Sequence, residues 1–336
     1  MQHSWIIFVV AKKLGFYSMF RLLAILIILI GLGLPESNAQ MWFLGQKGKK
    51  KSPFPVFKKH SSLSFGAGSS HYIGDLLPVG GLITAGAQAT RWNVGATITR
   101  HLSPNFSASL GLNYIRIAGD DNYFPAVGSW DANYLRNLHF RNDIKEMSLV
   151  GIYEIGGNAE NNLKRNTVSP YIYLGVSGFL HSPDAHEIAK INSAGNPVNG
   201  PWLSDKGESL QNYQNEGVDY SLFGVSIPFG VGVRYKLSSS MDLGFDFGYR
   251  VALTDYLDDV TDIRNSIIPG SVAGARMLYT DRSGETYAAY TLANRIPLPA
   301  TINAPKISVG PDQYFTTQVR IIYHLRNKVD CPPLPN

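Results

Sequence analysis

Apolar and polar residues alternate with a period of two in five segments of the chain, which is the pattern of β-strands with one apolar face. In residues 243–251, large apolar side chains alternate with glycine, aspartate and arginine. The five segments are 92–99, 106–114, 227–235, 243–251 and 317–325. Weaker segments at 63–68, 144–155 and 171–180 bring the predicted number of strands to eight.

The connections between these strands alternate in length. Short links follow the second, fourth and sixth strands, and long links follow the others, at 69–91, 119–142, 181–220 and 252–313. Outer-membrane barrels combine short periplasmic turns with long extracellular loops. The pattern therefore predicts an all-β fold, an eight-stranded antiparallel transmembrane β-barrel with long extracellular loops and both termini in the periplasm.

A soluble β-sandwich would show the same alternation, but its second face would carry Lys, Glu and Thr. Here the second face is mostly glycine and serine, which suit the crowded inside of an eight-stranded barrel. Aromatic residues lie near strand ends, as in the girdles of membrane barrels. They are Trp92, Phe106, Tyr114, Tyr235, Tyr249 and Tyr323. The membrane barrel is therefore the favoured fold.

An export signal precedes the strands. Lys12, Lys13 and Arg21 lie before an apolar run at 22–34, and a short polar stretch follows it to Ala39. This is the layout of a secretory signal, with Met1 or Met19 as its start. We expect a signal peptide at 1–39, a basic periplasmic N-terminal segment at 40–61, the barrel at 62–325 and a periplasmic C-terminal tail at 326–336. The predicted location is the outer membrane of a Gram-negative bacterium.

Composition adds little to this interpretation. Only 16% of the residues are charged, and the net charge of +5 falls to about +3 without the leader, which holds three Lys or Arg and one Glu. Such a small surplus does not indicate nucleic acid as a partner. The single cysteine, Cys331, has no partner for an intrachain disulfide.

The strand phase also predicts which charged residues face the lumen. Acidic and basic residues occur there in near balance, and an unpaired charge away from water is costly. We therefore expect ion pairs and a plugged barrel rather than a pore. The inward residues are Glu146, Glu154, Arg234, Lys236, Asp246, Arg250 and Arg320, with His324.

The long loops contain residues of the types found in metal or catalytic sites. His181 and His186 are expected in a solvated surface loop, and the pairs Asp120-Asp121 and Asp258-Asp259 offer too few oxygen ligands for calcium. The chain contains no Gly-x-Ser-x-Gly, His-Glu-x-x-His or phosphate-binding glycine motif. We expect no enzyme, no cofactor and no metal.

The segment before the first strand is rich in lysine. Its lysines are Lys47, Lys49, Lys50, Lys51, Lys58 and Lys59. Blocks of like charge are usually solvated and flexible, but at a membrane surface they also bind anionic headgroups. The sequence leaves both interpretations open, and an acidic periplasmic protein is a further possible partner.

Four short motifs occur in order between about residues 62 and 325: Tyr72, Gly74 and Asp75; Ala118 to Asp121; Arg136 and Phe140; and Tyr256, Asp258 and Asp259. Together they resemble the PorG-like outer-membrane family of Bacteroidetes. The resemblance implies an eight-stranded barrel of the type IX secretion system, which associates with periplasmic ring or lipoprotein components and does not conduct the cargo. Long loops at 182–216 and 262–312 depart from the family pattern.

Three functions are compatible with the sequence. The leading hypothesis is a non-enzymatic structural or assembly component of type IX secretion that anchors periplasmic partners in the outer-membrane lipid. The second is a surface protein whose long loops bind a ligand, a polysaccharide or another cell. The third is a small diffusion pore.

Overall fold

The computed structural model describes residues 57–156, 165–185, 207–213, 220–260 and 311–325, together with a few positions between 266 and 303. The predicted signal peptide, most of the basic segment and the C-terminal tail lie outside the described residues. Most of the two long loop insertions also lie outside them.

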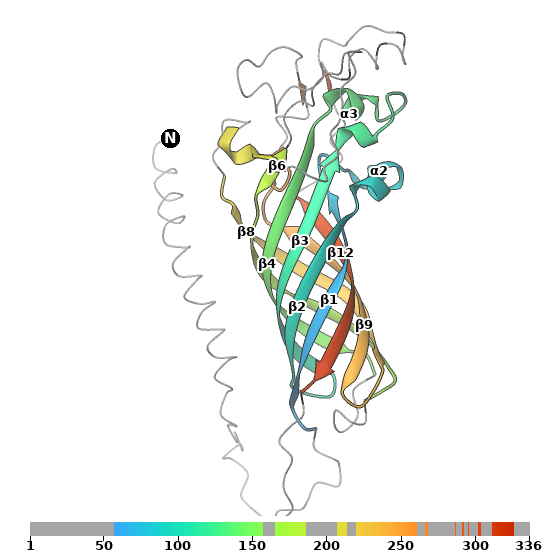
Figure 1. The fold of residues 1–336 in the computed structure, drawn as a ribbon, viewed down its shortest axis with the longest axis vertical. Coiled ribbons are helices and arrows are strands. Elements are labelled where there is room, and N and C mark those ends of the chain that lie inside the picture. Colours follow the sequence, from blue (N-terminus) through green and yellow to red (C-terminus); the bar gives the residue numbers. More distant parts are fainter. Residues whose placement is uncertain are drawn as a thin grey trace, which may run out of the picture. The chain divides into compact units, whose positions relative to one another are not determined.

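Eight antiparallel strands form a closed barrel (Figure 1). They are β1 (His60–Ile73), β2 (Arg91–His101), β3 (Phe106–Asp120), β4 (His139–Glu154), β5 (Val168–Leu180), β8 (Phe223–Lys236), β9 (Met241–Ala252) and β12 (Gln313–His324). Each strand pairs with its neighbours in this order, and β12 pairs with β1 to close the barrel. The predicted eight-stranded antiparallel barrel is confirmed.

The barrel has two different ends. At the turn end, short connections such as 102–105 and 237–240 join the strands. At the loop end lie the short elements η1 (Val79–Gly81), α2 (Leu82–Ala89), η2 (Asp121–Tyr123), α3 (Asp131–Arg136), β6 (Pro183–Ala185), β7 (Glu208–Ser209), η4 (Leu210–Tyr213), β10 (Ser266–Ile267) and β11 (Ile302–Asn303). Within the described residues, no helix has the length and apolarity that a membrane span requires.

Several strands are longer at the loop end than the sequence predicted. The expected loops began at residues 69 and 119, but β1 continues to Ile73 and β3 to Asp120, where Asp120 pairs with His139 of β4. The alternating pattern disappears in this region because loop elements cover both faces of the strands. All four residues from Ile117 to Asp120 are buried.

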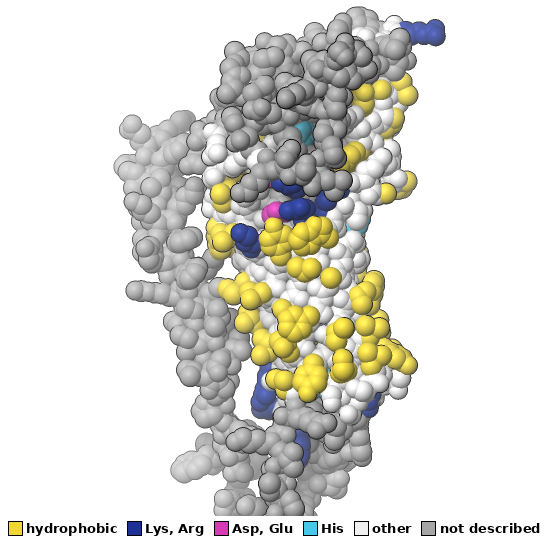
Figure 2. Space-filling view, in the orientation of Figure 1, with side chains coloured by type: hydrophobic (Ala, Val, Ile, Leu, Met, Phe, Trp, Pro, Cys, Tyr) yellow, Lys and Arg dark blue, Asp and Glu magenta, His cyan; other side chains and the backbone are white. Residues whose placement is uncertain are grey.

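The outer face of the barrel carries a belt of apolar side chains (Figure 2). In β9, Leu243, Phe245 and Phe247 point outward and are 39 to 49% exposed, whereas Gly244 and Asp246 between them are buried. A closed barrel has no unpaired edge, so its backbone is satisfied within lipid. Together with the apolar belt, this makes the chain a transmembrane barrel of the outer-membrane type.

The inward and outward phase of β9 predicts opposite effects for two substitutions. Phe247→Arg should destabilise the inserted barrel by about 2–4 kcal/mol, because it places a cation against the lipid. Phe247→Leu and Gly244→Ala should be mild. A methyl group on residue 244 comes closest to the flexible Cδ1 end of Ile322, at 3.1 Å, and meets Arg320 at an ordinary contact distance of 3.5 Å. The folded fraction after insertion into lipid vesicles, read from heat-dependent gel mobility, measures the effect. Equal yields for Phe247→Arg and Phe247→Leu would show that the assigned phase is wrong.

Candidate functional site

Six of the seven charged residues predicted to face the lumen point into the barrel and form three ion pairs. Arg234 Nη2 lies 2.7 Å from Glu154 Oε1, and Arg250 Nε lies 3.4 Å from Glu146 Oε2. Arg320 contacts Asp246. Lys236, also predicted to point inward, is half-buried at the end of β8. Both side chains of the Arg234–Glu154 pair and of the Arg250–Glu146 pair are buried, so each charge depends on its partner for stabilisation.

Neutral polar side chains donate further hydrogen bonds to two of these carboxylates, Glu146 and Asp246. Asn113 Nδ2 donates to Glu146 at 2.9 Å, and the Tyr314 hydroxyl donates to the same carboxylate at 3.1 Å. Tyr171 donates to Asp246, and its ring carries the Arg234 guanidinium at 4.8 Å. The lumen network therefore includes neutral as well as charged side chains, and its hydrogen bonds make the barrel interior rigid.

Glycine provides the space for one of these tyrosines. A Cβ atom at Gly232 would lie 2.4 Å from Cζ of Tyr171, which is too close for any side chain. The glycine that looks like a weak strand residue in the sequence is therefore needed beside a bulky aromatic in a narrow lumen.

Little free space remains inside the described part of the barrel. A cavity of about 70 Å³ is lined by Ser62, Asn113, Tyr171, Arg234 and neighbouring residues. Around this cavity, the buried ion pairs and the tyrosines bonded to them occupy the described lumen.

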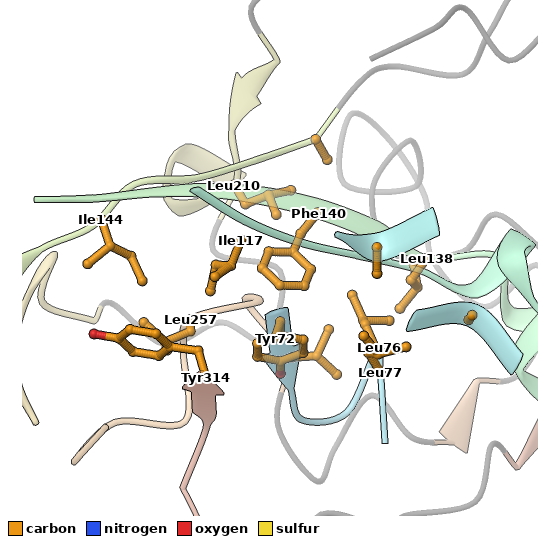
Figure 3. Close-up of a cluster of buried hydrophobic side chains, with 14 of the residues drawn as sticks. Tyr72, Leu76, Leu77, Ile117, Leu138, Phe140, Ile144, Leu210, Leu257 and Tyr314 are labelled. Atoms are coloured by element: carbon orange, nitrogen blue, oxygen red, sulfur yellow. The ribbon is translucent and has the colours of Figure 1, made fainter. Parts of the chain in front are cut away.

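At the loop end, a hydrophobic cluster closes the barrel; we call its buried residues the plug. Figure 3 shows Tyr72, Ile117, Phe140 and Leu257 among its members. Its other large members include Leu76, Leu77, Leu135, Leu138, Ile144, Leu210 and Tyr314. These residues come from β1, β3, β4, β12, α3, η4 and the connections between strands, so the plug ties the loops to the barrel.

A fully buried ion pair lies within the plug. Arg136, the last residue of α3, donates from Nε to Asp121 Oδ2 at 2.7 Å and from Nη2 to Oδ1 at 2.8 Å. Asn137 then adopts a left-handed conformation with φ 54°, and the next amide, that of Leu138, also donates to Asp121. Burial works against the charge of Arg136, but Asp121 raises its pKa above the usual value. The guanidinium is therefore charged and paired.

Two buried carboxyl groups share one tyrosine beside this pair. The Tyr72 hydroxyl lies 2.7 Å from Asp258 Oδ2 and 2.6 Å from Asp312 Oδ1. A phenol has one proton and donates to one acceptor at a time. The other carboxyl must then hold a proton and donate to the Tyr72 oxygen. Burial and the proximity of Asp312 raise the pKa of Asp258, and burial also raises that of Asp312.

The expectation that His181 lies in a solvated surface loop is wrong: the residue is buried, and burial lowers its pKa to about 4. His186 lies outside the described residues. Asp121, Asp258 and Asp259 of the two acidic pairs are buried as well. Asp184 pairs with Arg141 at 2.6 Å where β6 joins the edge of β4. The loops fold inward over the barrel, so their polar residues hold the plug together instead of facing water.

The residues that carry the family resemblance gather in and around the plug. Tyr72, Asp75, Arg136, Phe140, Asp258 and Asp259 are buried there. Gly74 forms a tight backbone bridge with Leu77, and the ring of Tyr256 stacks on that of Tyr220 at 4.6 Å. These motifs therefore mark a structural centre at the loop end.

Of the six lysines in the predicted basic segment, Lys58 and Lys59 are described, and both are exposed just before β1. The last two residues assigned to that segment, His60 and Ser61, belong to β1. Lys47, Lys49, Lys50 and Lys51 lie outside the described residues.

Sequence reasoning missed one cluster at the turn end. His324 was predicted to face the lumen, and the structure brings His60 and His101 next to it. The inward phase of β1 and β2, extended to their turn-end residues, would have found both.

The shared carboxyl pair gives the plug a defined pH response. Because the folded pKa of Asp258 lies above the ordinary value of 3.8, its stabilising contribution is present at low pH and is lost as pH rises through the folded pKa. We expect the free energy of unfolding in urea to fall as the pH rises above 3.8 and through the folded pKa of Asp258, with a slope of up to about 1.4 kcal/mol per pH unit for one proton. Asp258→Asn should flatten this dependence, whereas Asp131→Asn at the start of α3 should not. Parallel curves for the wild type and Asp258→Asn would contradict a shared proton.

No known protein family and no curated protein sequence matches this chain. Among solved structures, the chain is similar to Neisserial surface protein A, with 10% identity over 79% of this chain and 98% of that one and a TM-score of 0.35. The chain is 11% identical to the outer membrane protein OprG from Pseudomonas aeruginosa over 82% of this chain and 100% of that one, with a TM-score of 0.35. It is 9% identical to the attachment invasion locus protein Ail of Yersinia pestis, solved in complex with a heparin analogue, over 80% of this chain and 100% of that one, with a TM-score of 0.34. The fold class of the chain rests on its own strand pairing: it is an eight-stranded outer-membrane β-barrel.

Proposed function

We propose that this barrel is a non-enzymatic structural or assembly component of type IX protein secretion, which anchors periplasmic ring or lipoprotein components to the outer membrane. The filled lumen carries this proposal. A barrel whose interior is occupied by paired charges acts through its ends and its lipid-facing surface rather than by conducting cargo. The resemblance of the plug motifs to the PorG-like family supports the choice of secretion system.

In this proposal the turn end faces the periplasm, as the short turns of outer-membrane barrels do. Lys58, Lys59 and Arg100 are exposed there, and the four lysines at 47–51 precede them in the sequence. Arg165 also lies at the turn end, just before β5, but its side chain is buried and pairs with Asp242 at 2.6 Å, so it adds no charge to this surface. The exposed charges favour a partner with an acidic surface.

Deletion of the gene tests the role in secretion. We expect many exported proteins to disappear from the culture medium and to return when the wild-type gene is restored. A Phe247→Leu gene should restore them equally well. An unchanged set of exported proteins in the deletion strain would reject this function.

The basic segment gives a sharper test of the anchoring surface. Replacing Lys47, Lys49, Lys50, Lys51, Lys58 and Lys59 by Gln should reduce the amount of periplasmic protein that co-purifies with the crosslinked barrel. What remains should depend less on salt, because charge attraction to the partner is screened by ions. A matched variant replaces Lys145, an exposed lysine of β4 near the loop end, by Gln and should behave as wild type. Unchanged salt dependence in the six-site variant would exclude the basic segment as the anchor.

One observation favours the second candidate, a surface protein that binds a ligand or another cell. Ile83 of α2 is 96% exposed and Val79 of η1 is 59% exposed at the loop end, where apolar side chains would contact a partner. Under this function, Ile83→Ser would reduce attachment to cells or polysaccharide while the exported proteins stay unchanged.

A further inference from the structure

Three histidines meet inside the barrel at the turn end, beside the Arg234–Glu154 pair of the lumen. They come from adjacent strands: His60 is the first residue of β1, His101 the last of β2 and His324 the last of β12. His60 lies directly opposite His101 in the β1–β2 register, and His324 lies opposite Ser62. The three side chains are at most 2% exposed, and one ring nitrogen from each lies within 4.8 Å of the others.

Two of these imidazoles have a buried nitrogen without a hydrogen-bond partner among the described residues. The unpartnered atoms are Nε2 of His60 and Nδ1 of His324. Leaving such an atom buried and unsatisfied is costly. A metal ion uses the lone pairs that these nitrogens would present.

The opposite nitrogen of each ring is held in the way that metal-binding histidines are held. His60 Nδ1 lies 3.2 Å from the Lys58 carbonyl oxygen, and His324 Nε2 lies 2.7 Å from Asp242 Oδ2. Donation of the ring proton to a carbonyl or carboxylate fixes the tautomer and turns the other nitrogen toward the metal. Both contacts leave the unpartnered nitrogen as the available ligand atom.

His101 completes the set. Its Nδ1 lies 2.9 Å from Ser107 Oγ and 3.8 Å from Glu154, and its Nε2 lies 3.0 Å from the Ser62 hydroxyl. The Ser62 hydroxyl rotates freely, so Nε2 is available once a metal competes for it. The rings of His60 and His101 stack with centroids 4.4 Å apart and planes 15° apart, so one ring must rotate before both present an in-plane lone pair to a common ion.

Two ion pairs border the site, Arg165 with Asp242 and Arg234 with Glu154. The exposed Arg100 adds a further cation that acts on His60. Imidazole nitrogen is a preferred ligand of zinc, copper and nickel, whereas calcium and magnesium require oxygen ligands. A tetrahedral zinc ion holds its ligand nitrogens about 3.4 Å apart, so the imidazoles must move together by up to about 1.4 Å.

We propose that His60, His101 and His324 bind one zinc ion at the turn end of the lumen, with water as the fourth ligand. The site connects β12, β1 and β2, and so it cross-links the last strand of the barrel to the first. Bound zinc therefore stabilises the closed barrel against separation of its terminal strands.

Zinc titration of the folded protein in detergent tests the site. The protein is prepared without a polyhistidine tag, and calorimetry measures the binding of Zn²⁺ alone. We expect one ion per chain and a higher unfolding temperature with zinc. Co²⁺ in place of zinc should give the visible absorption of a tetrahedral ion. His60→Gln and His324→Gln should each lower the affinity for zinc by roughly 100-fold or more. Each removes a direct ligand, and loss of an outer-shell partner already lowers metal affinity by about 10–100-fold.

The control is His71→Gln, in the same strand but outside the cluster, where the His71 ring stacks on Phe315. It should bind zinc as the wild type does. His60→Gln and His324→Gln remove imidazoles with an unpartnered nitrogen, so both barrels should fold, which heat-dependent gel mobility verifies. If either does not, His101→Gln and the Co²⁺ spectrum of the wild type decide the question. Absence of zinc binding by the wild type, or equal affinity in the cluster variants and His71→Gln, would overturn the site.

Discussion

The charges inside the barrel must be paired, because an eight-stranded barrel is only just wide enough for its own side chains and holds little water. Glu154 with Arg234, Asp246 with Arg320, and Glu146 with Arg250 meet this requirement at successive levels of the lumen. Tyr171, Tyr314 and Asn113 donate further hydrogen bonds to the carboxylates of Asp246 and Glu146. The small residues on the inward face follow from the same constraint, since each bulky lumen side chain needs an open position opposite it.

At the loop end, beyond the ion pairs, the barrel contains a hydrophobic core instead of a charged lumen. The plug packs apolar residues around Asp121, Arg136 and the carboxyls that share Tyr72, as the interior of a soluble domain does. Its strands continue beyond the apolar belt because their pairing is extended by this core. The loop end is therefore built as a fixed structure, and the surface that it presents is set by packing within the chain.

The number, direction and phase of the strands followed from the sequence because a period of two is preserved wherever one face meets lipid and the other the lumen. In β9, alternation identified Phe247 as outward and Asp246 as inward. Pairing of the lumen charges followed from their balance and the narrow interior. The plug could not be predicted, because Asp121 and Arg136 lie in a region where both faces are buried and no periodicity remains. The carboxyl pair of Asp258 and Asp312 brings together residues 54 positions apart, and only the packed loops show that proximity.

Membrane conductance tests the filled lumen most directly. The purified, folded barrel is inserted into a planar lipid bilayer, and the current is recorded under an applied voltage at high and low salt. Paired charges and a cavity of about 70 Å³ predict no steady current. Replacing Arg234 and Glu154 together by alanine would widen the lumen and should produce brief openings. A stable conductance of the wild-type barrel that increases in proportion to salt would contradict the account, because it would require a continuous water-filled path through the ion pairs.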